Sequence, residues 1–204
     1  MVNSNFWNDI YSKKSLQDVS WFADELATSK RLVSSLAPSK TSRIIDIGAG
    51  RSPLIDELLR SGYDAVTLFD ISEEALEQTK NRLGNNACRI ETLAGDITTY
   101  EFESKYYDLW HDRAAFHFLT DQSQRDAYKN AAKKALIRGG YVVIATFGPD
   151  GPTKCSGLEV NRYSSMQLAA ELGDGFRLLG SKSEVHWTPS KTGQQFVYSW
   201  FKLL

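Results

Sequence analysis

The feature that most constrains the fold is an alternation of short apolar runs with longer amphipathic stretches. The apolar runs lie at residues 43–47, 65–70, 89–95, 106–111 and 140–147. The stretches between them have helical periodicity and lie at residues 52–62, 72–84 and 123–140. A glycine that can cap the end of a helix closes each stretch, at Gly62, Gly84 and Gly139. Strands that alternate with helices predict a parallel sheet with helices on both faces.

The two ends of the chain add elements of another kind. Residues 3–11 and 20–36 precede the first apolar run and are predicted to be helical. Residues 164–172 form a further predicted helix. Behind it, the runs at 176–187 and 194–204 are separated by the short turn TPSKTG, which indicates an antiparallel hairpin. The predicted fold class is therefore α/β, a Rossmann-like open sheet that is mostly parallel and ends in an antiparallel hairpin.

Composition and charge disfavour several classes of protein. The chain has 204 residues, 42% of them hydrophobic, so one domain can bury a full core. A formal net charge of −1 provides no basic surface for nucleic acid, and no apolar run is long enough to predict a membrane span. No secretory signal is visible, and Cys88 and Cys155 lack the spacing of metal ligands. We expect a cytoplasmic monomer or weak homodimer without nucleic-acid, membrane or metal partners.

A glycine pair follows the first apolar run. Gly48 and Gly50 stand where the backbone must turn and where the absence of a Cβ lets a ligand approach closely. Ser52 and Pro53 are expected as the cap and the first residue of the next helix. Asp70 ends the second run, 70 − 50 = 20 residues after Gly50, which is the distance typical of an acid that binds ribose hydroxyls. Because ligands bind beyond the carboxyl ends of such strands, this pattern predicts a nucleoside site.

The pattern argues against a nicotinamide dinucleotide. The fingerprint G-x-G-x-x-G would place its third glycine at position 53, where this chain has Pro53. The hairpin also takes the place of a second mononucleotide-binding half. No phosphate-binding G-x-x-x-x-G-K-[ST] loop occurs in the sequence. A nucleoside ligand without a pyrophosphate is therefore favoured.

Three segments carry a family resemblance. "IIDIGAGRSPL" resembles the first motif of class I S-adenosylmethionine-dependent methyltransferases, "LFDIS" the second and "LAGDI" the third. The resemblance extends through "YDLWHDRAAFHFL" and "ALIRGGYVVIATF" to the terminal hairpin, with Ser52 at the family's usual third glycine. "FWNDIYSKKSLQDVSWF", "HDRAAFHFL" and "GPDGPTKCSGLEVNRY" are similar to a subgroup of small bacterial-type enzymes related to thiopurine-type and protein-lysine (citrate synthase-type) methyltransferases.

The resemblance implies S-adenosylmethionine as cofactor and S-adenosylhomocysteine as product. Asp70 would accept hydrogen bonds from both ribose hydroxyls, and Asp96 would accept one from the adenine amino group. Asp46 would brace the glycine loop or the ammonium of the cofactor. The other implied cofactor contacts are Gly48, Gly50, Arg51, Ile71, Ile97 and His111.

The same resemblance places the end of the fourth run beside the reactive methyl group. The catalytic residues that it implies are His111, Asp112, Arg113 and His117. A histidine that titrates near neutrality is suited to take a proton from an amine nucleophile. A structural role fits His111 and His117 equally well. Cys155 is a weaker candidate for a nucleophile, because its loop has no histidine nearby in the sequence.

Residues 1–42 are expected to form a helical lid segment ahead of a methyltransferase domain at residues 43–204, within a single domain overall. Aromatic residues so close to a polar N-terminus need a surface to pack on, although an ordinary core position would also satisfy them. The predicted lid and substrate contacts are Trp7, Tyr11, Trp21, Arg162 and Tyr163.

The predicted methyl acceptor is a protein side chain, in the first place a lysine amine, or a small-molecule nucleophile. The residues after the fourth run read HDRAAF and lack the Asn/Asp-Pro-Pro-aromatic run of enzymes that methylate base amino groups, which disfavours nucleic acid. Two alternatives stay open. One is a small-molecule methyltransferase acting on a thiol, amine or metalloid. The other is a non-catalytic sensor or partner subunit that binds S-adenosylmethionine.

Overall fold

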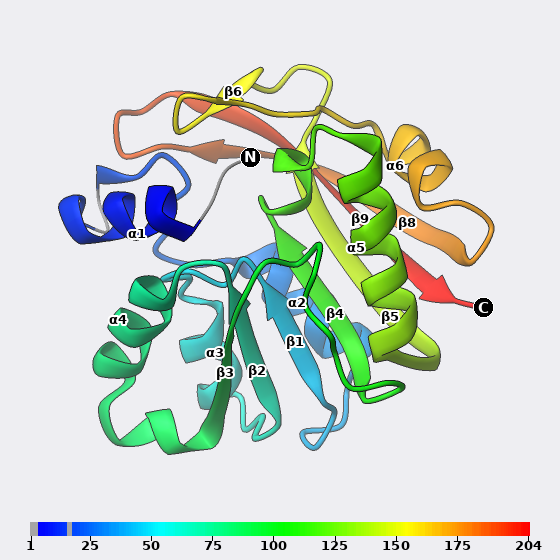
Figure 1. The fold of residues 1–204 in the computed structure, drawn as a ribbon, viewed down its shortest axis with the longest axis horizontal. Helices are drawn as coiled ribbons and strands as arrows, with labels where there is room; N and C mark the ends of the chain where they lie inside the picture. The colour runs from blue at the N-terminus through cyan, green and yellow to red at the C-terminus, as the bar shows by residue number, and fades with distance from the viewer. Residues whose placement is uncertain (1–3, 16–17) are drawn as a thin grey trace.

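The computed structural model describes residues 4–15 and 18–204 of the protein (Figure 1). Its centre is a seven-stranded sheet in the order β3-β2-β1-β4-β5-β9-β8. The strands are β1 (Ile44–Ile47), β2 (Val66–Asp70), β3 (Ile90–Ala94), β4 (Tyr107–Arg113), β5 (Leu136–Phe147), β8 (Phe176–Trp187) and β9 (Gly193–Leu203). The first five strands pair in parallel, and β9 pairs antiparallel with both β5 and β8. The predicted fold class is confirmed.

Helices cover both faces of the sheet, as predicted. They are α1 (Ser4–Lys13), α2 (Ala27–Leu36), α3 (Leu54–Arg60), α4 (Glu73–Leu83), α5 (Gln122–Ala135) and α6 (Ser165–Leu172). On one face, α2, α3 and α4 pack apolar side chains such as Val33 and Leu58 onto Ile44. On the other face, α5 and α6 pack Tyr128 and Leu168 into the cluster of the inner strands. The predicted residue Asn3 of the first helix lies outside the described residues.

The second predicted helix is shorter than expected. Residues 20–36 were expected to be helical, but α2 begins only at Ala27. The amide of Leu26 donates a hydrogen bond to Glu57 Oε1 of α3 (3.2 Å), with Leu26 at φ −110° and ψ 62°. This contact with another element holds the preceding chain outside the helix. Because α2 also buries Val33 in the core, it belongs to the body of the fold, and the lid position is left to α1.

The helix expected over residues 123–140 also ends early. The backbone of Leu136 is extended (φ −78°, ψ 144°), and this buried residue pairs with Tyr107 of β4. The strand β5 therefore begins directly after α5. Gly139 lies inside β5 at φ +81° and is not a helix cap. Gly62 and Gly84, in contrast, follow α3 and α4 with positive φ, as the sequence predicts. The α3 helix begins at Leu54, one residue later than expected, and Ser52 Oγ accepts a hydrogen bond from its amide (3.2 Å).

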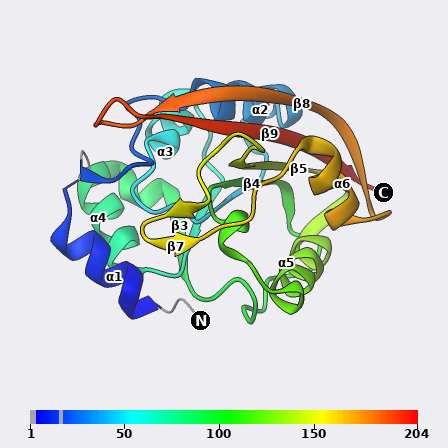
Figure 2. The same cartoon turned by 90° about the horizontal axis from the view of Figure 1, so that it is seen from above.

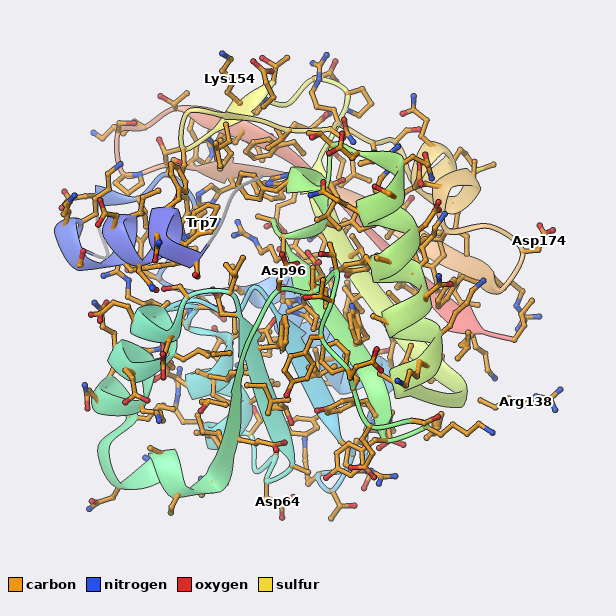
Figure 3. The ribbon with its side chains drawn as sticks, in the orientation of Figure 1. Trp7, Asp64, Asp96, Arg138, Lys154 and Asp174 are labelled. Atoms are coloured by element: carbon orange, nitrogen blue, oxygen red, sulfur yellow. The ribbon has the colours of Figure 1, made fainter. Side chains whose placement is uncertain are left out.

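Short elements lie at both ends of the sheet. The η2 helix (Gly84–Arg89) leads into the amino end of β3. At the carboxyl ends of the inner strands lie η3 (Phe116–Phe118) and a small hairpin of β6 (Lys154–Cys155) and β7 (Leu158–Glu159). In Figure 2 this hairpin is seen above the sheet, between α1 and α5. Figure 3 shows Trp7, Asp96 and Lys154 toward one end of the sheet and Asp64 and Arg138 at the opposite end. The first of these ends is the one at which an open α/β sheet binds ligands.

Candidate active site

The larger of two neighbouring cavities lies beyond the carboxyl ends of the strands and has a volume of about 350 Å³. One part of its wall comes from the ends of β1 and β2 and from the segment after β3. The other part comes from α1, the loop after β4 and the β6–β7 hairpin. Its lining includes the predicted residues Trp7, Tyr11, Trp21, Gly48, Asp70, Ile71, Asp96, Ile97 and Arg113.

The glycine loop holds Asp70 in place at the end of β2. Asp70 Oδ2 accepts a hydrogen bond from Gly50 N, and Oδ1 accepts one from Ser72 N, both at 2.8 Å. Gly50 has φ +48°, and a Cβ on it would lie 2.5 Å from Tyr11 Oη. Glycine is therefore required here by both conformation and space. Each carboxylate oxygen keeps a further acceptor site, so Asp70 can still accept hydrogen bonds from a ligand diol.

The charge state of Asp70 is sensitive to its surroundings. Burial raises the pKa of its carboxyl group to about 6, and the backbone N–H groups of Ser72 and Gly50 oppose that rise. The negative charge of Asp46 adds to it. Donors supplied by a ligand would favour the ionised form. The ribose-binding role of Asp70 stays a prediction that this geometry supports.

Asp96 begins the turn after β3. Its Oδ1 accepts hydrogen bonds from Thr98 N (2.8 Å) and from Thr98 Oγ1 (2.7 Å). Ile71 and Ile97 line the same region of the larger cavity. An acid and two aliphatic side chains in the wall of one cavity suit a flat, polar-edged ring such as adenine, the role that the family resemblance implies.

The smaller cavity, of about 50 Å³, adjoins the larger one. The two share Tyr11, Trp21, Gly48 and Arg113 in their walls. The predicted cofactor residues that line the smaller cavity alone are Asp46, Arg51 and His111. The residues predicted to bind cofactor are therefore divided between two connected spaces.

His111 is held on both sides. Its Nδ1 lies 2.6 Å from Asp46 Oδ1 and its Nε2 lies 2.9 Å from Ser29 Oγ, and its side chain is 1% exposed. Strand register explains the first contact, because Asp46 of β1 is paired with His111 of β4. Its predicted role as a base stays untested, but neither ring nitrogen is free for an acceptor in the larger cavity.

Asp112 and His117 do not line either cavity, so their position does not support the predicted catalytic role. Side chains alternate along β4, which turns Asp112 away from the face of its neighbours in sequence. There Asp112 Oδ2 accepts a hydrogen bond from Tyr128 Oη (2.8 Å), and burial raises the pKa of Asp112 to about 6. His117 is fully buried, its Nδ1 accepts a hydrogen bond from Phe147 N (3.2 Å), and burial lowers its pKa to about 3.

Four aromatic side chains, Trp7, Tyr11, Trp21 and Phe118, form what we call the aromatic wall of the larger cavity. The ring centroids of Trp7 and Phe118 are 5.2 Å apart, and those of Trp7 and Trp21 are 5.9 Å apart. Both pairs have edge-to-face geometry, the favourable arrangement for aromatic rings. Trp7, Tyr11 and Trp21 thus line the cavity, and their role as lid and substrate contacts stays a prediction.

The α1 helix is fastened to the glycine loop and to α4. Arg51 Nη1 donates a hydrogen bond to Lys14 O (3.0 Å), and Gln78 Nε2 donates one to Tyr11 O (3.1 Å). The N-cap hydroxyl of α4 lies 2.7 Å from Asn8 Oδ1. These contacts place α1 over the cavity and occupy much of the Arg51 guanidinium.

Arg162 and Tyr163 do not line either cavity, so the prediction that they contact the ligand site is not supported by their position. Arg162 Nη1 donates a hydrogen bond to Pro149 O (2.7 Å) and thereby holds a loop. Tyr163 is buried, and its Oη accepts a hydrogen bond from Asn161 Nδ2 (3.1 Å). Both residues support the chain that carries the β6–β7 hairpin.

Several lining residues are not identified by the sequence as binding residues. They are Phe118, Leu119, Thr120, Asp121, Gln124, Leu158 and Glu159. The strands β6 and β7 have only two residues each, too few for an alternating pattern to be recognised. Cys155 also lines the cavity, and burial raises the pKa of its thiol to about 11, which disfavours the thiolate needed of a nucleophile.

Within residues 4–15 and 18–204, no group of three or more His, Cys, Asp or Glu side chains is arranged to hold a metal ion. No helix in this described part is long and apolar enough to cross a membrane.

The residues present fit S-adenosylmethionine. Gly48 brings the backbone to the wall of both cavities, Asp70 and Asp96 offer acceptors, and Ile71 and Ile97 offer apolar surface. Gly50 lines neither cavity, because Tyr11 Oη takes the space beside it. An open, mostly parallel sheet with a glycine loop after β1 and an acid after each of the next two strands is the class I methyltransferase arrangement that the sequence motifs imply.

Comparisons with known proteins agree with this class. Residues 44–140 match a family model described as a methyltransferase domain. The chain is 24% identical over 123 residues to the eEF1A lysine and N-terminal methyltransferase of Mus musculus, covering 60% of this chain but only 17% of that protein. It is 26% identical over 155 residues to EEF1A lysine methyltransferase 2 of Danio rerio, covering 69% of this chain and 66% of that protein.

Solved structures share the fold at low sequence identity. One, described as "Conversion of a Disulfide Bond into a Thioacetal Group during Echinomycin Biosynthesis", has a TM-score of 0.78 at 13% identity and covers 98% of this chain and 92% of that one. Burkholderia thailandensis 1,6-didemethyltoxoflavin-N1-methyltransferase, with bound 1,6-didemethyltoxoflavin and S-adenosylhomocysteine, has a TM-score of 0.68 at 17% identity and covers 98% and 83%. Residues 44–140 therefore match a methyltransferase domain, and the chain shares its fold with a solved methyltransferase structure.

Proposed function

We propose that the protein binds S-adenosylmethionine in the larger cavity and transfers its methyl group to the side-chain amine of a lysine in a protein. The observation that carries the proposal is the division of this cavity into two halves. We call the lining residues of the segments that follow β1, β2 and β3, which include Asp70 and Asp96, the cofactor half, and the aromatic wall with the β6–β7 hairpin the acceptor half. The first half suits an adenosine and the second suits a cation on an apolar stem.

When bound, S-adenosylmethionine supplies an electrophilic methyl group on a sulfonium. The chain itself binds and orients the two reactants and excludes water from them. These effects are the larger part of catalysis when the reacting groups are intrinsically reactive. Asp70 and Asp96 orient the nucleoside, and Tyr11 and Trp7 close the cavity. An amine must lose its proton before it can react, and the described lining offers no histidine in the larger cavity to accept it.

Charge at the mouth of the cavity supports a cationic acceptor. Asp121 and Glu159 both line the cavity and are exposed, and Glu159 Oε1 also pairs with Lys154 Nζ (2.9 Å). They would attract the ammonium form of lysine, which can then release its proton to water. Relatives named as lysine methyltransferases support the same acceptor.

A small-molecule acceptor is the second candidate, and one observation favours it. The α1 helix and the β6–β7 hairpin both supply residues that line the cavity. A structural neighbour whose substrate is a small heterocycle has the same fold. A cavity walled by these two elements suits a small nucleophile at least as well as a lysine side chain presented by a folded protein.

The test is methyl transfer from S-adenosylmethionine labelled in its methyl group, in a lysate of cells that lack the protein. We expect label in discrete protein bands and at lysine after hydrolysis of those bands. Label confined to the small-molecule filtrate would replace the lysine proposal with the second candidate. Cofactor binding without any transfer of label would leave a non-catalytic sensor or partner subunit.

A further inference from the structure

Most of the exposed large apolar side chains in the described part of the chain lie on one strand, β8. Leu179, Val185 and Trp187 are 41%, 52% and 67% exposed, and only Met166 and Leu204 complete the set within residues 4–15 and 18–204. Val185 and Trp187 are two positions apart and therefore lie on the same face of the strand. Apolar side chains gathered on one exposed strand mark a candidate contact surface.

The same strand forms the open edge of the seven-stranded sheet, and it runs along the outer rim of the molecule in Figure 2. Within the described residues β8 pairs with β9 alone, so the N–H and C=O groups on its other side have no backbone partner. The pairing with β9 shifts between Leu178 and Gly180 and is regular from Gly180 to Trp187. A regular strand with one free edge can pair with a further strand.

Two opposite charges lie near the middle of this regular stretch. Lys182 Nζ is 3.5 Å from Glu184 Oε2. Both side chains also reach the hydroxyl of Thr28 in α2, which accepts a hydrogen bond from Lys182 (2.8 Å) and donates one to Glu184 (2.5 Å). The side chains of Lys182 and Glu184 are still 41% and 32% exposed, so each can contact a partner. A strand that matches this edge therefore brings a carboxylate to Lys182 and a cation to Glu184.

The sequence of β8 itself meets this requirement. When two copies of one strand pair antiparallel about a twofold axis, the register is defined by the residue that faces its own copy. Centring on Ser183 places Lys182 opposite Glu184 of the second copy, and does so twice. Centring on Lys182 or on Glu184 places like charges opposite each other, which is destabilising. Centring on Ser181 or on Val185 pairs neither charge with an opposite one. The charges therefore favour the register centred on Ser183.

We propose that β8 is the contact surface of a homodimer, in which a second copy of this chain pairs its own β8 antiparallel in the register centred on Ser183. In that register Ser181 faces Val185 of the second copy, and Trp187 extends toward Leu179 of the second copy. The exposed apolar side chains of the two copies thereby cover one another. A pair of edge strands is a small contact, so the dimer is weak and depends on concentration.

The first experiment reverses the charges one at a time and then together. Sedimentation velocity of the full chain over a range of concentrations measures the dissociation constant of the dimer. The variants are Lys182→Glu, Glu184→Lys and the double reversal. Arg177→Glu is the matched control, because Arg177 is also an exposed charge of β8 but has no residue of the second β8 opposite it in this register.

We expect each single reversal to weaken the dimer by at least about fivefold, since two attractive pairs become two repulsive ones. The double reversal restores opposite charges across the contact and should return the dissociation constant close to that of the wild type. Arg177→Glu should dimerise as the wild type does. Melting temperatures check that every variant is folded.

The second experiment tests the register with single cysteines, in a Cys88→Ser background because Cys88 is an exposed thiol. Residues directly opposite in an antiparallel pair have Cα atoms about 4.5–5.5 Å apart, which a disulfide can span. Ser183→Cys should therefore form a covalent dimer on mild oxidation. Ser181→Cys is the matched control, because its two copies would lie roughly 13 Å apart along the strands and should stay unlinked.

Three results would overturn the proposal. One is a wild type that sediments as a monomer up to its highest soluble concentration. Another is a dimer that the single charge reversals leave unchanged, which would place the contact on a different surface. The third is equal crosslinking of Ser183→Cys and Ser181→Cys, which would contradict the register. None of residues 176–187 lines either cavity, so each of these failures leaves the proposed function to its own labelling test.

Discussion

The cofactor half of the larger cavity is built from one continuous part of the chain, whereas the acceptor half combines four separate parts. Gly48, Asp70 and Asp96 follow three successive strands that pair with one another. Trp7, Trp21, Phe118 and Leu158 come from α1, the irregular segment before α2, η3 and β7. A local motif can specify the first half, but only tertiary packing assembles the second. We therefore expect changes in the two halves to have separable effects on binding and on turnover.

The largest effect is expected from deletion of residues 1–14, which removes α1 and half of the aromatic wall. Turnover should fall by about 10²-fold or more, the scale of a lost positioning surface. Steady-state kinetics measures the rate, and circular dichroism checks that the domain is still folded. A truncated protein that methylates at the full rate would show that the acceptor half does not need α1.

Asp70→Ala addresses the cofactor half. Calorimetry should show at least a tenfold weaker affinity for S-adenosylhomocysteine, because each hydrogen bond to a charged group contributes about 1.5–3 kcal/mol. The thermal midpoint without ligand should also fall, because the amides of Gly50 and Ser72 lose a buried acceptor.

Asp108→Ala is the matched control for that variant. Asp108 Oδ2 also accepts a backbone hydrogen bond, from Arg43 N (2.7 Å), but Asp108 lies outside both cavities. The Asp108→Ala variant should have a lower thermal midpoint and an unchanged affinity for S-adenosylhomocysteine. If Asp70→Ala behaves in the same way, Asp70 does not bind the ribose.

Cofactor affinity should depend on pH through Asp70. Its pKa of about 6 in the ligand-free protein means that the carboxylate accepting hydrogen bonds is lost as the pH falls below 6. If that carboxylate is required, affinity should fall by up to about tenfold for each pH unit below that point. Calorimetry on either side of pH 6 measures this. Asp70→Asn should show a flat profile there, and a flat profile in the wild type would contradict the assignment.

The smallest effect concerns His117, outside both halves. Its pKa is lowered from 6.5 to about 3, so the unfolded chain binds a proton that the folded protein does not. The contribution of neutral His117 to the free energy of unfolding is therefore complete above pH 6.5. This contribution is lost as the pH falls toward 3. His117→Gln should lose less thermal stability than the wild type on acidification. Parallel pH profiles of the two melting temperatures would show that His117 is not held neutral by burial.

Much of the fold was predictable because its signals are local. Residues 65–70 and 140–147 are predicted to be strands from their own apolar runs, and the hairpin is predicted from one turn. The errors occur where another element overrides local preference. Leu26 is held out of a helix by Glu57, a residue of α3, and Leu136 leaves the helical pattern to pair with Tyr107.

The candidate site divides in the same way. Asp70 and Asp96 were predictable because glycine spacing and strand ends set their positions. Asp112 lies outside both cavities because the alternation along β4 turns it away from the face of His111 and Arg113, and its own residue pattern does not reveal this. Glu159 was not identified because β7 is two residues long and only the folded chain brings it to the cavity.

The most direct test of the central claim compares S-adenosylhomocysteine with NAD by calorimetry on the full chain. Both ligands carry an adenosine, but only NAD requires room for a pyrophosphate, where this chain has Pro53 in place of a glycine. We predict micromolar-range binding of S-adenosylhomocysteine and no measurable binding of NAD. Comparable affinity for NAD would contradict the assignment of this cavity to S-adenosylmethionine.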